Sequence, residues 1–129
     1  MSTDLKAAAR TALACLDLTS LNDADTAADI AALCQRAQTV NGPVAAVCVW
    51  PRFVAQARAA LPASIKVAAV ANFPDGSLDV QRALADVAEI AQAGGDEVDV
   101  VLPYRALMAG QTNEVAEFLR GAKKTLDIA

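Results

Sequence analysis

Two carboxylates, Glu97 and Asp99, interrupt an apolar run within the segment from Asp96 to Gly110, whose pattern predicts a buried β-strand running into a helix. Side chains alternate between the two faces of a strand, so Glu97, Asp99 and Val101 share one face and the other face is apolar. An ionised carboxylate is costly in a dry interior. The pair therefore indicates water, partner groups or a reacting substrate beside it, and Asp99, nearer the carboxyl end of the strand, is the better candidate for chemistry.

Asp17 is a second candidate for proton transfer. Together, Asp17 and Asp99 would form a carboxylate pair in which burial and mutual repulsion raise one pKa toward neutrality. The same residues are compatible with structural roles, in which Asp17 caps the turn from Thr19 to Asp23 and Asp99 pairs with a basic group. The sequence leaves both interpretations open.

Candidate nucleophiles are few. Cys48 has no histidine anywhere in the chain to activate it, so a small core thiol is the better interpretation, as it is for Cys15 and Cys34. An odd number of cysteines without a Cys-x-x-Cys pair predicts reduced thiols and no metal site. A lysine could form an imine with a carbonyl substrate, but none is well placed on the predicted elements: Lys6, Lys66, Lys123 and Lys124.

Apolar strands alternate with helices along the whole chain, which predicts parallel βαβ units with right-handed crossovers. Asp23 or Asp25 is expected to cap the second helix. The predicted strands are Cys15–Leu18, Val44–Trp50, Lys66–Phe73 and Glu97–Leu102, and the predicted helices are Leu5–Leu13, a helix ending near Ala37, Pro51–Leu61, Leu78–Ala93 and Asn113–Asp127.

Two α/β architectures fit this order, a small open sheet and half of an eight-stranded barrel. An open nucleotide-binding sheet normally has a glycine-rich turn after its first strand, and residues 17–21 contain no glycine. We therefore predict a single domain over residues 1–129, a parallel (βα)4 half of a TIM barrel with a short N-terminal helix. Its mouth would carry the polar residues near the carboxyl ends of the strands: Asp17, Thr19, Cys48, Asn72 and Asp99.

Composition limits the class of protein. The 129 residues are 55% hydrophobic and 20% charged, with a formal net charge of −4, which is typical of a folded protein and unlike a nucleic-acid-binding surface. The first residues do not resemble a secretory signal, and no apolar run is long enough to span a membrane. We expect a cytoplasmic protein that binds neither nucleic acid nor membrane.

Four segments resemble deoxyribose-phosphate aldolase, in that family's order and spacing: Leu16 to Asp23, Ala46 to Phe53, Val70 to Pro74, and Asp96 to Gly110. The resemblance implies a TIM-barrel enzyme of deoxyribonucleotide catabolism that needs no metal or other cofactor and cleaves 2-deoxyribose 5-phosphate to acetaldehyde and glyceraldehyde 3-phosphate. A Schiff-base lysine attacks the carbonyl in this family. The resemblance also implies a catalytic role for Asp99 and substrate-site positions for Asp17, Thr19, Leu21 and Cys48.

The resemblance covers the N-terminal half of the family alone, and the strands that carry the Schiff-base lysine and the phosphate-binding loops have no counterpart in these residues. We expect no aldolase turnover from this chain by itself, because imine formation supplies the electron sink for carbon-carbon cleavage. The open edges and open face of a half-barrel predict either self-association, most simply a homodimer, or pairing with a C-terminal half. Two alternatives are a non-catalytic, self-associating half-barrel scaffold and an unrelated enzyme that uses Asp17 and Asp99.

Overall fold

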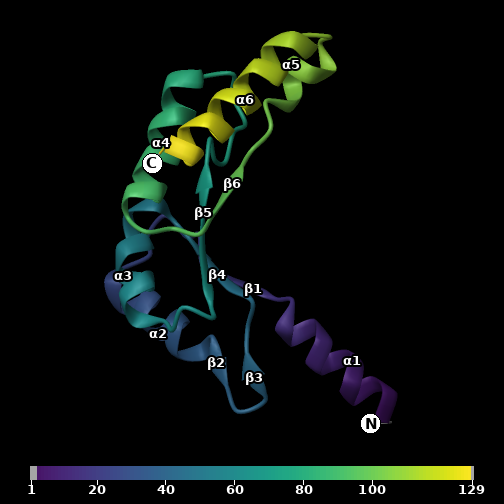
Figure 1. Cartoon of the computed structure of the whole chain (residues 1–129), viewed down its shortest axis with the longest axis vertical. Coiled ribbons are helices and arrows are strands. Elements are labelled where there is room, and N and C mark those ends of the chain that lie inside the picture. The colour runs from purple at the N-terminus through teal and green to yellow at the C-terminus, as the bar shows by residue number, and fades with distance from the viewer. Residues whose placement is uncertain (1–2, 129) are drawn as a thin grey trace.

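A four-stranded parallel sheet forms the centre of the chain, whose computed structural model describes residues 3–128 (Figure 1). The strand order is β1-β4-β5-β6, so each strand of this sheet pairs with the one that follows it along the chain. This arrangement confirms the predicted parallel α/β fold. The strands are β1 (Asp17–Thr19), β4 (Ala46–Val49), β5 (Lys66–Ala71) and β6 (Glu97–Val100).

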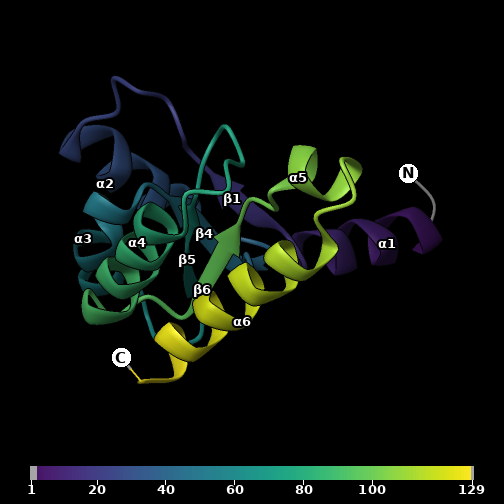
Figure 2. The same ribbon diagram turned by 90° about the horizontal axis from the view of Figure 1, so that it is seen from above.

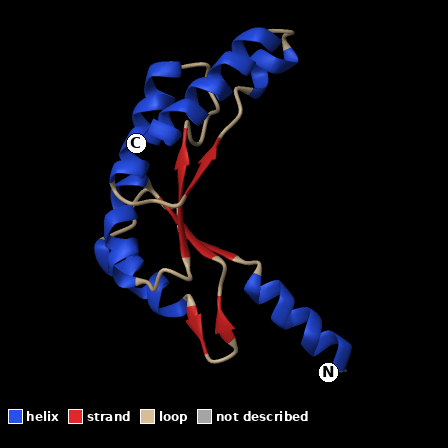
Figure 3. Cartoon of the chain, viewed as in Figure 1, coloured by secondary structure: helices blue, strands red, loops and turns tan. Residues whose placement is uncertain are grey.

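Helices cover one face of this sheet, as Figures 2 and 3 show for α2, α3, α4 and α6. The short helix η1 leads into α3, and α5 lies between β6 and α6. The helix α1 projects away from the sheet before β1. The helices are α1 (Thr3–Ala14), α2 (Ala27–Arg36), η1 (Pro51–Phe53), α3 (Val54–Ala60), α4 (Val80–Gln92), α5 (Tyr104–Met108) and α6 (Thr112–Ile128).

The main hydrophobic core lies between the sheet and these helices. Alternate residues of the central strands, such as Val47 and Val67, are fully buried against Ile30 of α2 and Ile90 of α4. Alternation sends their neighbours to the opposite face, where Cys48, Ala68 and Val70 form a second, smaller cluster. The fold therefore separates a large structural core from a second, concave face.

Three details differ from the sequence-based expectations. An antiparallel hairpin of β2 (Gln38–Thr39) and β3 (Gly42–Pro43) was not predicted, because two-residue strands leave almost no periodic signal. The strand β6 is less buried than its apolar pattern predicted, since it is an edge strand with both carboxylates exposed. The segment after it forms the separate short helix α5 before α6 begins.

The cap of α2 was also predicted wrongly. Thr26, not Asp23 or Asp25, is the N-cap, and its hydroxyl accepts a hydrogen bond from the backbone N–H of Asp29. The Asp29 carboxylate in turn accepts from the N–H of Thr26 over 2.7 Å, completing a capping box. Asp29 was overlooked because a capping box usually carries glutamate or glutamine at this position.

Candidate active site

The strand register brings the predicted polar residues onto the sheet face that lacks the covering helices. Thr19, Cys48, Ala68 and Glu97 occupy one row across the four strands, and Asp99 lies one row further toward the carboxyl ends, beside Val70. Aligned residues of parallel strands point to the same side. This face is called the lumen face below.

Cys48 and Asp99 are in direct contact on the lumen face. The thiol of Cys48 donates a hydrogen bond to Oδ2 of Asp99, with 3.6 Å between sulfur and oxygen. The two residues belong to β4 and β6, and β5 runs between them. The contact reaches across β5 because that strand presents the small side chain of Ala68. Side chains of alternate strands meet in this way inside parallel barrels.

The environment of Cys48 keeps its thiol protonated. Burial is the largest cause that raises the pKa of Cys48, to about 12, followed by the charge of Asp99 and the hydrogen bond to it. The charges of Asp17 and Glu97 raise this pKa further. Carboxylates from β1 and β6 thus converge on one buried sulfur, which is neutral at physiological pH. This agrees with the interpretation of Cys48 as a pocket thiol and not a nucleophile.

The loop after β1 forms one wall of the lumen face. Leu21 is half-buried and packs with Trp50 and Phe73 against the Cys48 cluster. Trp50 and Phe73 meet edge to face with ring centroids 5.3 Å apart, and the indole N–H of Trp50 donates to the carbonyl of Asn22. Phe73 is the wall residue that sequence reasoning did not single out, since an aromatic residue just after a strand gives no specific signal.

Asp17 and Thr19 are exposed on this face. Thr19 lies in the Cys48 row, but Asp17 lies in the row of Ala46 and Lys66 at the amino ends of the strands, so its predicted place at the mouth is wrong. The hydroxyl of Thr19 donates to the backbone carbonyl of Asp17 over 3.2 Å. The carboxylate of Asp17 does not hold the following turn, because Asp25 fills that role by accepting from Ser20 and Asn22. The hydrogen bond from Ser20 is the largest cause that lowers the pKa of Asp25. The alternative role considered for Asp17, as a turn cap, is therefore wrong.

The alternative role of Asp99, pairing with a basic group, is not observed either. Among residues 3–128 its hydrogen-bond partner is the Cys48 thiol, and none of the ion pairs formed there includes it. Asp99 is exposed, and its Oδ1 atom has no hydrogen-bond partner within the described part of the chain. A water molecule or a substrate hydroxyl can approach this oxygen.

Asn72 does not belong to the lumen face, contrary to the expectation from strand alternation. Its side chain is fully buried, and its amide donates to the carbonyls of Ser77 at 2.7 Å and Val101 at 3.0 Å. Its backbone has φ of +57°, in the left-handed region, which ends the alternation at this residue. Asn72 therefore joins the loop after β5 to the end of β6.

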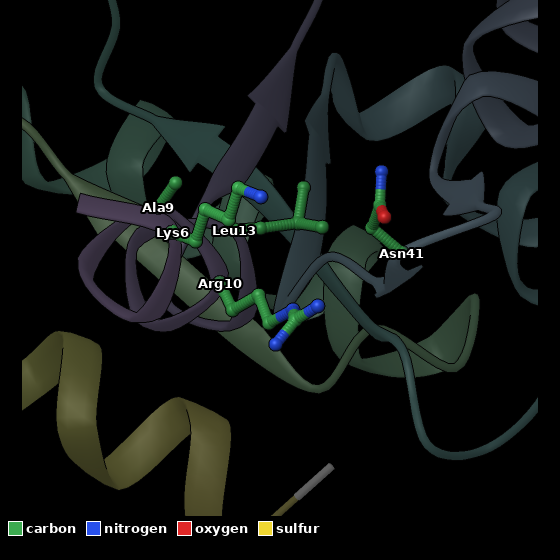
Figure 4. Close-up of a pocket in the computed structure, with 5 residues that line it drawn as sticks. All are labelled: Lys6, Ala9, Arg10, Leu13 and Asn41. Atoms are coloured by element: carbon green, nitrogen blue, oxygen red, sulfur yellow. The ribbon is translucent and has the colours of Figure 1, made fainter. Parts of the chain in front are cut away.

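The four lysines lie away from the mouth. Lys66 shares the lumen face but begins β5, in the row of Ala46 at the amino ends of the strands. Lys123 on α6 pairs with Asp127, and Lys124 is exposed on the same helix. Lys6 lines a hollow of about 460 Å³ on α1 with Ala9, Arg10, Leu13 and Asn41 (Figure 4). The helix α1 that carries Lys6 precedes β1 and leads into its amino end.

The two arginines near the strand ends are held by neighbouring groups. Arg52 lies over the rings of Trp50 and Phe53 and contacts the carbonyl of Asp23. Arg105 lies over Tyr104 and donates to the carbonyl of Asp75.

Within the described residues, no group of three or more His, Cys, Asp or Glu side chains is arranged to hold a metal ion. None of the described helices combines the length and apolarity needed to cross a membrane.

Comparison with known proteins places the chain in a family. Residues 11–125 match the family model of the DeoC/LacD family aldolases. The chain belongs to the DeoC/LacD aldolase family. The deoxyribose-phosphate aldolase of Agrobacterium fabrum is 49% identical over 119 residues, which are 91% of this chain and 46% of that enzyme. The chain thus spans less than half the length of this relative.

Solved structures of the same kind share the fold. A putative deoxyribose-phosphate aldolase from Coccidioides immitis superposes with a TM-score of 0.80 at 24% identity, covering 96% of this chain and 56% of that one. A tetrameric deoxyribose phosphate aldolase from Aeropyrum pernix gives a TM-score of 0.69 at 21% identity, covering 91% of this chain and 50% of that one. The parallel sheet therefore matches about half of these aldolase structures.

Proposed function

We propose that this chain supplies half of the active site of a deoxyribose-phosphate aldolase, which cleaves 2-deoxyribose 5-phosphate to acetaldehyde and glyceraldehyde 3-phosphate. The observation that carries the proposal is the placement of Asp99 beside Cys48 on the lumen face. Family membership supports the chemistry, and the 49% identical relative is named for this activity.

Asp99 is proposed to move protons at the substrate. Its Oδ2 atom accepts a hydrogen bond from the Cys48 thiol, and its Oδ1 atom has no hydrogen-bond partner among the described residues, so a substrate proton can be served there. A proton-transfer group has to be positioned within hydrogen-bond reach of the atom that it serves. Thr19 and Leu21 are proposed to line the sugar-binding side of this site, and Asp17 is proposed to contact the substrate from deeper in the lumen, at the amino end of β1.

The amine that forms the imine is proposed to come from outside this chain. No lysine of the described residues stands at the carboxyl ends of the strands, and Lys66, the one lysine on the lumen face, stands at the opposite end of β5. Without an imine there is no electron sink for the carbon-carbon step. We therefore expect the 129-residue chain alone to be inactive.

The test is an assay of deoxyribose 5-phosphate cleavage. The purified chain is assayed alone and after co-expression with the part of the Agrobacterium enzyme that the match leaves uncovered. We expect no turnover alone, turnover in the co-expressed complex, and a loss of about 100-fold or more in kcat for Asp99→Asn in that complex. The control is Glu117→Gln, a charge removal on the exposed part of α6.

Two outcomes contradict the proposal. One is turnover by the chain alone, with borohydride trapping substrate on one of its own lysines. The other is an active complex in which Asp99→Asn and Glu117→Gln have the same kcat. Intact masses after borohydride treatment identify which polypeptide carries the imine.

A further inference from the structure

Asn72 lies where the loop after β5 meets the end of β6, and within residues 3–128 no other polar or charged residue is as fully buried. We propose that Asn72 is a positioning residue for the candidate active site, which holds both the Phe73 ring and the Asp99 carboxylate in place. The inference rests on the proposed function, because it concerns how the proton-transfer group and one wall of that site are held.

Every polar group of Asn72 has a partner. The side-chain amide donates to the carbonyls of Ser77 at 2.7 Å and Val101 at 3.0 Å, and its oxygen accepts from the Ser77 hydroxyl at 3.3 Å. The backbone N–H donates to Oδ2 of Asp86 on α4, and the backbone carbonyl accepts from the N–H of Gly76. A displaced partner would leave a buried polar group unpaired, so this network fixes the geometry of the three segments that it joins.

The first consequence concerns Asp99, which precedes Val101 by two residues. The N–H of Val101 donates to the carbonyl of Ala71, and its carbonyl accepts from the Asn72 amide. Both backbone groups of Val101 are therefore held by two successive residues of the neighbouring chain segment. This holds the carboxyl end of β6 at the register in which Asp99 lies beside Val70.

The second consequence concerns Phe73. Strand alternation after Val70 would direct residue 72 to the lumen face and residue 73 to the main core. The left-handed backbone of Asn72, with φ of +57°, exchanges the two directions. Asn72 is buried as a result, and the Phe73 ring packs beside the Cys48 cluster, 5.3 Å from the ring of Trp50.

Close packing alone does not fix the Phe73 ring. A hollow of about 150 Å³ lies beside it, lined by Trp50, Arg82 and Asp86 among others. Arg82 donates to the carbonyl of Phe73 over 2.7 Å, which anchors the backbone after Asn72. The direction of the ring then depends on the backbone conformation at Asn72.

The chain carries one reporter for each consequence, and neither needs a substrate. Trp50 is its single tryptophan, so the fluorescence of the chain reports the contact with Phe73. The Cys48 thiol is hydrogen-bonded to Asp99 and feels its charge, so the alkylation rate of Cys48 reports where Asp99 stands. The exposed Cys15 is the internal reference for the reagent.

Two substitutions separate the side chain of Asn72 from its backbone. Asn72→Gly removes the amide and still adopts a left-handed backbone without cost, whereas Asn72→Ala removes the amide and disfavours that backbone. The control is Leu33→Ala, a buried position of α2 in the main core, which is a different cluster from that of Cys48 and Phe73. Circular dichroism checks folding, and trimethylamine N-oxide is added to all samples if Asn72→Ala is partly unfolded without it.

We expect both Asn72 variants to alkylate at Cys48 about three- to tenfold faster at pH 8, because Asp99 is no longer held beside the thiol. In an Asp99→Asn background, Asn72→Gly should give no further increase, since the charge that it releases is already absent. Asn72→Ala should also move the Trp50 emission to longer wavelength, while Asn72→Gly leaves it unchanged. Leu33→Ala should change neither reporter.

Three results overturn the inference. One is an Asn72→Gly increase of the same size in the Asp99→Asn background, which would mean that the substitution merely opens the fold. The others are an equal response to Leu33→Ala, and a folded Asn72→Ala chain with unchanged Trp50 emission.

Turnover separates this inference from the proposed function. In the complex co-expressed with the uncovered part of the Agrobacterium enzyme, Asn72→Gly should lower kcat more than it changes KM, because it displaces a proton-transfer group. Reporters that respond as expected in a chain whose complex has no turnover would contradict the proposed function alone. Asp99-dependent turnover with an unchanged kcat for Asn72→Gly would overturn the positioning role.

Discussion

The thiol of Cys48 and the carboxylate of Asp99 meet across an intervening strand, at 3.6 Å between Sγ and Oδ2. The contact joins residues 51 positions apart in the sequence, and it forms because Ala68 leaves space above the middle strand. The contact positions Asp99, and it adds to burial, which is the larger cause, in raising the pKa of Cys48. The two effects can be measured separately from catalysis.

Cys48 should alkylate far more slowly than Cys15. Its pKa of about 12 leaves only a minute thiolate fraction at pH 8, whereas Cys15 is exposed. Because the thiolate is the reactive form, modification by iodoacetamide should rise tenfold per pH unit and continue rising above pH 10. Peptide mass spectrometry after timed labelling gives the rate at each cysteine.

Asp99→Asn should speed this alkylation, because it removes a negative charge that disfavours the Cys48 thiolate. The expected change is about tenfold at pH 8. Glu117→Gln removes a distant charge and serves as the control, with no expected change at Cys48. Alkylation of Cys48 as fast as that of Cys15, or at a rate that Asp99→Asn does not change, would contradict the buried, negatively charged environment described for the Cys48 thiol.

Arg58 should be a major source of stability. Its guanidinium pairs with Asp96 over 2.6 Å and donates to the carbonyls of Leu61, Pro62 and Ile65, and Asp96 also accepts from the N–H of Val67. Arg58→Met leaves these acceptors with fewer partners and should lower the free energy of unfolding by about 2–4 kcal/mol. Urea unfolding at fixed protein concentration measures this.

The matched control is Arg120→Met. Arg120 pairs with Glu117 over the same 2.6 Å, but the side chains of Arg120 and Glu117 are 70% and 73% exposed. Exposed pairs contribute little, so the expected cost is below about 1 kcal/mol. Equal effects of the two substitutions would mean that the Arg58 network does not contribute as its contacts indicate.

Asn72→Ala should also destabilise the chain, by about 2–4 kcal/mol, because the carbonyls of Ser77 and Val101 lose a buried donor. The residue also adopts a left-handed backbone that alanine disfavours. Asn41→Ala, at an exposed position in the hairpin, should change the free energy of unfolding by less than about 0.5 kcal/mol. A thermal melt that shows no difference between the two variants would contradict the structural role of Asn72.

The sequence predicted the parallel sheet well because period-two and helical patterns are strong in the central elements. Strand alternation also placed Asp17, Cys48 and Asp99 on one face, since alternation is a geometric property of any extended strand. Alternation failed at Asn72, where a left-handed residue ends the strand, and this conformation has no reliable sequence signal. The distance between Cys48 and Asp99 depends on register across three strands, which single-sequence patterns do not determine.

Gly76→Ala should be the most informative substitution near the mouth. Gly76 has φ of +63°, and a Cβ there would lie 2.7 Å from the carbonyl oxygen of Leu102 and 2.8 Å from a methyl carbon of Val101. Gly110 also has a positive φ, +85°, but a Cβ there would meet nothing within 4 Å. Gly110→Ala should therefore cost about 1 kcal/mol from backbone strain alone, and Gly76→Ala about 3 kcal/mol, because close packing adds to the same strain. Urea unfolding of both variants isolates the packing contribution as their difference, and equal losses would show that the loop after β5 is free to move away from the end of β6.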